Sequence, residues 1–108
     1  MAELENPAPV ATIEHSSDAS GAPLLKVSGE LDLSNVETLR REIDRALTTA
    51  PKSLVFDLSD LAFMDSSGIA AFLQASRRVD AIVLRNPSNI IRRVVAATGL
   101  TEILRVEP

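Results

Sequence analysis

The residues best suited to chemistry stand together in the string Asp65-Ser66-Ser67-Gly68, between two apolar segments. These small residues either only turn the chain and begin a helix, with Asp65 or Ser66 as its N-cap, or they present one hydroxyl for modification. A phosphate on Ser66 would meet the free amides and the positive dipole end of that helix, which stabilises it by about 0.3–1 kcal/mol. It would also add roughly −1.5 to −2 charges. Ser66 is therefore the candidate for a switch of binding that leaves the domain's shape intact.

Side chains for other kinds of catalysis are scarce. A serine nucleophile needs a neighbouring base, and the only histidine, His15, is expected in an exposed loop. The four glycines stand apart, so the sequence has no phosphate-binding glycine loop. Asp57, Asp60 and Asp65 would make at best a weak site for a hard cation. Asp57 also ends a predicted strand, like the phosphoacceptor of a response-regulator receiver, but the acidic pair and the lysine of that chemistry are absent. We therefore predict no catalytic residue, metal or cofactor.

Composition narrows the class of partner. The formal net charge is −4 and three phenylalanines are the only aromatic residues, which argues against nucleic-acid binding. The chain has no cysteine and no apolar run of about 20 residues, so neither disulfides nor a membrane span is expected. The N-terminus lacks the basic and apolar regions of a signal peptide. We expect a cytoplasmic protein.

Strands and helices are predicted to alternate along one domain. Residues 1–9, with two prolines and two glutamates, are expected to form a flexible tail, and residues 10–108 the domain. The order predicts an α/β fold, a mixed and largely parallel sheet of four to five strands with about three main helices and an opening β-hairpin. The predicted strands are 10–14, 24–28, 53–58, 81–84 and 103–106, with a hairpin loop at 15–23. The helices start near 34, 66 and 86 and end near 48, 78 and 99.

The helices carry their own signals in the sequence. Ser34 and Glu37 fit a capping box, in which each side chain bonds the other's backbone amide. Gly99 is well placed to end the third helix. The side chains of this third helix that are expected to face inward are Ile90, Ile91, Val94 and Val95.

Functional side chains are expected at one edge of the sheet. In open parallel sheets, sites gather where the strands end at their carboxyl side. The segments that reach this edge are 29–32, 57–68 and 85–88. We therefore expect Glu30, Asp32, Asp57 and Asp60 near Ser66, so that a phosphate there would be surrounded by acids.

Three long strings together resemble one known family. They are VSGELDLSNVETLRREI, LVFDLSDLAFMDSSGIAAFLQASRRV and NPSNIIRRVVAATGLTEILRV, and they cover about residues 10–106. In this order they are similar to a STAS domain of the anti-sigma factor antagonist (anti-anti-sigma factor) type. The most specific parts are the D-S-S-G string, the turn at 29–32 and the T-G-L ending of the third helix at 98–100.

The resemblance implies a regulatory role. In such proteins the first serine of the D-S-S-G string, here Ser66, is phosphorylated by the partner anti-sigma factor, a GHKL-type serine kinase. The unphosphorylated form binds that partner and releases a sigma factor, and a PP2C-type phosphatase resets the switch. The domain is then a kinase substrate without catalytic activity. Asp65 would orient or cap, Ser67 and Gly68 would complete the turn, and the loop before the first helix would dock. The partner-binding residues implied in this way are Glu30, Asp32, Asn35, Asp65, Ser66, Ser67 and Gly68.

One departure from the family pattern concerns the chain after the second helix. Residues 77–81 pass straight from helix to strand, where family members usually have a longer stretch closed by two glycines. This predicts a shorter helix or loop at the edge away from Ser66. Two alternatives to the switched antagonist remain. One is a constitutive STAS scaffold or regulatory subunit of a transport or stress-sensing complex, and the other is an unrelated enzyme.

Overall fold

The computed structural model describes residues 10–99 and 101–108, so the predicted tail at 1–9 lies outside the described residues. Strands and helices alternate within the described ranges, as predicted. The elements are β1 (Ala11–Ser17), β2 (Pro23–Leu31), α1 (Val36–Ala46), the 3-10 helix η2 (Leu47–Thr49), β3 (Ser53–Asp57), β4 (Leu61–Met64), α2 (Ser66–Ser76), β5 (Ala81–Arg85), α3 (Asn89–Ala97) and β6 (Leu104–Glu107).

The strands form one mixed sheet in the order β1-β2-β3-β5-β6, and β4 also pairs with β2. The β1–β2 hairpin is antiparallel, and the other four strand pairs of the described chain are parallel. The predicted fold class is therefore confirmed. The six strands exceed the predicted four to five because the short strand β4 is not among the predicted strands.

Strand β2 serves two parallel partners in succession. Its first half, from Leu24 to Lys26, pairs with β3, and its end, from Gly29 to Leu31, pairs with β4 after a register shift. Gly29 makes this possible because its φ is +93° and a Cβ there would lie 2.2 Å from the carbonyl oxygen of Val10. A side chain at this position would both strain the backbone and collide with it.

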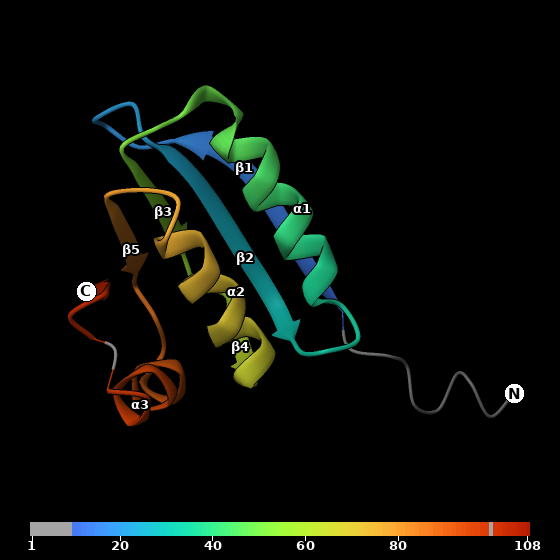
Figure 1. Ribbon diagram of the computed structural model, residues 1–108. Coiled ribbons are helices and arrows are strands. Elements are labelled where there is room, and N and C mark those ends of the chain that lie inside the picture. Colours follow the sequence, from blue (N-terminus) through green and yellow to red (C-terminus); the bar gives the residue numbers. More distant parts are fainter. Residues whose placement is uncertain (1–9, 100) are drawn as a thin grey trace, which may run out of the picture.

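Helices α1 and α2 lie side by side over one face of the sheet (Figure 1). The apolar stripe of α1 faces the sheet, and four of its residues are buried: Val36, Leu39, Ile43 and Ala46. The rings of Phe56 and Phe72 meet with their centroids 4.7 Å apart and join β3 to α2. Helix α3 packs against β4 instead. None of the helices in the described ranges is both long and apolar enough to span a membrane.

Two local predictions were wrong. His15 lies on β1 and not in a loop, because the hairpin continues to the Ser17–Pro23 pair, and its ring contacts the carboxylate of Glu42 on α1. Ile90 is exposed although it was expected to face inward. Helix α3 has nine residues and touches mainly the narrow strand β4, so it buries Ile91 and Val95 fully and Val94 only in part.

Candidate functional site

The helix α2 begins at the carboxyl edge of the sheet, beside the end of β2 (Figure 1). Asp65 is its N-cap, with the extended backbone (φ −96°, ψ −172°) that this position requires. The Asp65 carboxylate accepts hydrogen bonds from the Ser67 hydroxyl and from the Ser67 amide, the latter at 2.9 Å. The hydroxyl bond is the main reason that the pKa of Asp65 is lowered, and backbone amides at Ser67, Leu33 and Gly68 add to it. Asp65 is thus a charged cap at neutral pH.

The two neighbouring serines have different surroundings. The Ser67 hydroxyl donates to Asp65, and the residue is half-buried. Ser66 is exposed at the first position of α2, and no group in residues 10–99 or 101–108 hydrogen-bonds its hydroxyl. One hydroxyl therefore belongs to the cap of the helix, and the other is available to an external reagent.

Gly68 has a role that the sequence reasoning did not assign to it. It is buried in the first turn of α2, and a Cβ there would lie 2.5 Å from Cγ of Met64 and 2.9 Å from Cδ2 of Leu31. Both neighbours are buried at the ends of β4 and β2, so they cannot swing away. Gly68 therefore allows α2 to approach the sheet closely, and through that contact it fixes where Ser66 sits.

The loop from β2 to α1 is held by its own polar side chains. The Asp32 carboxylate accepts from the amide of Ser34 at 2.9 Å and from its hydroxyl at 2.6 Å. The Asn35 side chain accepts from the Asp32 amide at 3.0 Å and donates to the carbonyl of Glu30 at 2.8 Å. The predicted capping box is wrong, because Ser34 turns back to Asp32 and the N-cap of α1 is Asn35, which makes no capping bond with its side chain.

The two loops at this edge are joined to each other. The Asp65 amide donates to the carbonyl of Leu31 at 3.1 Å, and the Leu33 amide interacts with the Asp65 carboxylate. The side chain of Leu33 itself is 77% exposed. Leu33 was not among the predicted site residues, although a lone apolar residue inside the polar run Asp32-Leu33-Ser34-Asn35 is a recognisable signal. The structure thus places Asp32 and Asn35 on the loop that contacts the N-cap of α2, and Glu30 just before this loop, near the end of β2.

Asp57 and Asp60 do not join this site, contrary to the prediction. The register places Asp57 opposite Lys26 on β2. Lys26 stands five residues before Leu31, and five residues of a strand span about 16 Å at ~3.3 Å per residue. Asp60 forms an ion pair with Lys26 at 3.1 Å and raises the pKa of that lysine. Asp57 lies instead in a cross-strand row of alternating charges, on the sheet face opposite the helices. The row consists of Lys26, Asp57, Arg85 and Glu107.

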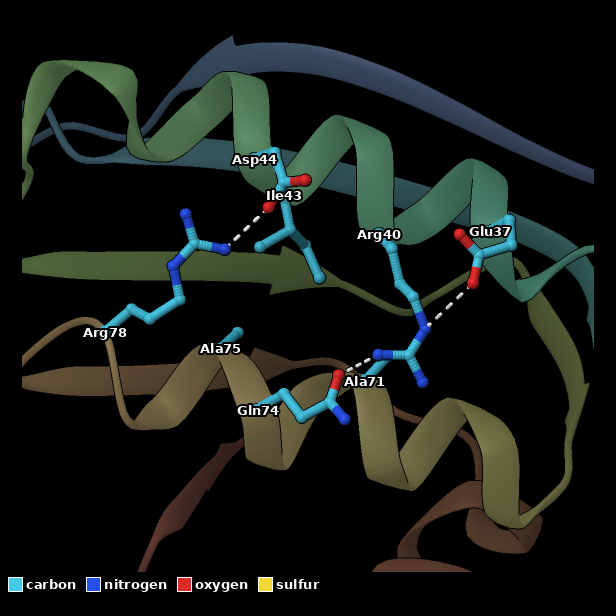
Figure 2. A pocket seen from close by; sticks show the side chains of 8 residues that line it. All are labelled: Glu37, Arg40, Ile43, Asp44, Ala71, Gln74, Ala75 and Arg78. Carbon is cyan, nitrogen blue, oxygen red and sulfur yellow. Dashed lines mark hydrogen bonds and ion pairs between the residues drawn. The ribbon is translucent and has the colours of Figure 1, made fainter.

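A cleft of about 230 Å³ lies between α1 and α2, away from the start of α2 (Figure 2). Its polar side chains already satisfy one another. Arg78 bonds Asp44 across the helices at 2.6 Å, and Arg40 reaches both Gln74 on α2 and Glu37 on its own helix. These contacts hold the two helices together and leave no convergent set of acid, base and nucleophile. Within the described residues, no three acidic or histidine side chains come close enough to hold a metal ion.

The amino-acid sequence is similar to one known domain family and to individual proteins within it. A sequence model of the STAS domain matches residues 12–108. An anti-sigma F factor antagonist from Lysinibacillus sphaericus is 34% identical over 82 residues, which cover 71% of this chain and 70% of that protein.

Solved structures show the same fold in two chemical states. The unphosphorylated anti-sigma factor antagonist SpoIIAA superposes with a TM-score of 0.74 at 27% identity, covering 88% of this chain and 87% of that one. The phosphorylated form of Bacillus SpoIIAA superposes with a TM-score of 0.67 at 26% identity, covering 88% and 90%. The extent of the sequence match and the shared fold together show that the chain belongs to the STAS domain family.

Proposed function

We propose that this chain is an anti-sigma factor antagonist whose binding is switched off by phosphorylation of Ser66. In the unphosphorylated form it binds a cognate anti-sigma factor and thereby releases a sigma factor. The anti-sigma factor is a GHKL-type kinase that transfers the γ-phosphoryl group of ATP to Ser66, and a PP2C-type phosphatase removes it. The observation that carries this proposal is the exposed and unbonded hydroxyl of Ser66, next to a Ser67 hydroxyl that is committed to the helix cap.

The relatives support the same role. The Lysinibacillus protein is named an anti-sigma F factor antagonist, and SpoIIAA is known in a phosphorylated form. The phosphorylated form of SpoIIAA does not by itself identify the modified residue of this chain. Its assignment to Ser66 therefore rests on the local geometry and on the D-S-S-G string.

The position of Ser66 suits a switch that acts on a partner and not on the fold. The transfer turns the hydroxyl into a phosphate ester and releases ADP and a proton. The new group carries roughly −1.5 to −2 charges, and the free amides and dipole of α2 accommodate it. A partner docked over Ser66, however, would have to accommodate this added negative group at the contact. A loss of about 3–4 kcal/mol in this contact weakens binding by two to three orders of magnitude.

Phosphorylation of matched serine variants tests the proposal. The wild-type protein, Ser66→Ala and Ser67→Ala are each incubated with the cognate kinase, ATP and Mg²⁺, and the products are analysed by intact mass and peptide mapping. We expect one phosphate on the wild type and on Ser67→Ala, and none on Ser66→Ala. A phosphate on Ser66→Ala, or a wild type that binds its partner but takes no phosphate, would refute the switch. The second result would favour a constitutive scaffold.

A further inference from the structure

Leu33 is the most exposed of the large apolar side chains in the described ranges, with 77% of its surface accessible. A single exposed leucine is common on protein surfaces and needs no explanation by itself. The position of Leu33 is less ordinary, because it lies between Asp32 and Ser34 in the loop that touches the N-cap of α2. The backbone of Leu33 is therefore held next to the N-cap of α2, the helix whose first residue is Ser66.

The loop presents Leu33 in a fixed orientation. The flanking polar side chains turn toward the loop backbone: Asp32 bonds Ser34, and Asn35 bonds both the Asp32 amide and the Glu30 carbonyl. The leucine side chain is left pointing into solvent. A contact residue that is already ordered in the free protein loses little entropy on binding, so such an arrangement favours affinity.

The surroundings of Leu33 are acidic and partly apolar. Phe63 on β4 is 45% exposed and pairs in register with Glu30, at the same edge of the sheet. The acidic residues beside Leu33 are Glu30 near the end of β2, Asp32 directly after that strand, and Asp65 at the N-cap of α2. A surface that complements this one would offer an apolar pocket bordered by basic side chains.

We propose that Leu33 is the apolar anchor through which this chain docks on its anti-sigma factor, and that it enters an apolar pocket with a lysine- or arginine-rich border. The inference rests on the function proposed above. The residues of the loop then have different roles: Asp32 and Asn35 hold the backbone in place, and Leu33 makes the contact with the partner. Docking by Leu33 then presents the neighbouring Ser66 to the nucleotide of the kinase.

Calorimetric titration of the anti-sigma factor, with ADP present, tests this anchor. The proteins compared are the unphosphorylated wild type, Leu33→Asn, the conservative Leu33→Met and a control, Ile103→Asn. Ile103 is 50% exposed and directly precedes β6, so it lies at the amino edge of the parallel strands, opposite the edge that carries Ser66. We expect Leu33→Asn to weaken binding roughly 10- to 100-fold, as the loss of a buried leucine predicts. We expect Leu33→Met and Ile103→Asn to stay within about fivefold of wild type, and all three melting temperatures to remain unchanged.

The outcomes separate the two proposals. If the wild type does not bind the anti-sigma factor, the proposed function fails and the anchor fails with it. If the wild type binds and Leu33→Asn binds equally well, or Ile103→Asn is weakened as much, only the anchor is refuted. A large drop in the melting temperature of Leu33→Asn would show a structural role instead. Wild-type affinity that does not fall with added salt would contradict the basic border. Self-association of the free chain that Leu33→Asn abolishes would make a second copy the occupant and overturn the proposal.

Discussion

Replacing Ser66 or Ser67 by alanine removes one hydroxyl group from neighbouring positions of the D-S-S-G string. The structure predicts that the two substitutions lower the free energy of unfolding by different amounts. In Ser67→Ala the hydroxyl bond to the Asp65 carboxylate is lost. In Ser66→Ala no bond within the described residues is lost, and the site is exposed. Comparison of the two variants therefore tests whether the Ser66 hydroxyl contributes to the stability of the fold.

The magnitude follows from the local contacts. A hydrogen bond to a charged group contributes about 1.5–3 kcal/mol when well shielded. Ser67 is only half-buried, and its amide still bonds Asp65 after the substitution, so we expect a loss of about 0.5–1.5 kcal/mol. In a domain of this size that lowers the melting temperature by roughly 2–10 °C. For Ser66→Ala we expect a change within about 0.5 kcal/mol of zero.

Urea and thermal denaturation of the two variants provide the assay. A double-mutant cycle with Asp65→Ala is the control, because the cost of Ser67→Ala should largely disappear once its acceptor is gone. A destabilisation by Ser66→Ala that equals or exceeds that of Ser67→Ala would mean that the Ser66 hydroxyl is part of the helix cap. The reasoning that separates the two serines would then be refuted.

Three further substitutions test local features of the structure. Gly68→Ala should cost about 1–3 kcal/mol of unfolding free energy because its Cβ would meet Met64 and Leu31, and a neutral effect in urea would disprove the close approach. The cap hydrogen bonds hold the pKa of Asp65 below the ordinary 3.8. The charged Asp65 carboxylate therefore makes its full contribution to the free energy of unfolding above that pH, and this contribution is lost as the pH falls through the lower pKa of the folded state. Between about pH 4 and 2 the melting temperature of Asp65→Asn should therefore fall less steeply than that of wild type, and parallel curves would contradict this. Ala50 is left-handed, with φ 51° and ψ 52°, so Ala50→Gly should raise the free energy of unfolding by about 0.5–1 kcal/mol, and a loss of stability would show that no strain is stored there.

Much of the fold could be predicted because long apolar patterns reflect burial directly. The stripe of α1 and the buried strands β3 and β5 appear in the sequence as helical spacing and as continuous apolar runs. Strand β4 could not be found in this way. Its four residues, Leu61–Met64, are all apolar, and only the two ends of the strand are buried. So short an apolar run shows no alternation and does not by itself distinguish a strand from other buried structure. Its existence depends on Gly29, which lets β2 exchange one partner for another.

The candidate site could be predicted only in part, because some of its features follow from local sequence and others depend on strand register and loop geometry. Asp65 and Ser66 follow from local rules for helix starts, which depend on a few neighbouring residues. The distance between Asp57 and Asp65 depends on strand register, and the sequence did not reveal that β4 separates them. Ser34 fits a capping box by spacing, but Asp32 competes for its hydroxyl at close range. Such competition between polar side chains is decided by loop geometry, which residue types alone do not specify.

The affinity of the cognate anti-sigma factor for the Ser66-phosphorylated protein, measured beside that of the unphosphorylated protein, tests the proposed switch most directly. We predict that one phosphate on Ser66 weakens binding by at least about 100-fold, while circular dichroism and the melting temperature show an unchanged fold. Equal affinity of the two forms, or a phosphorylated protein that has lost its fold, would contradict the account.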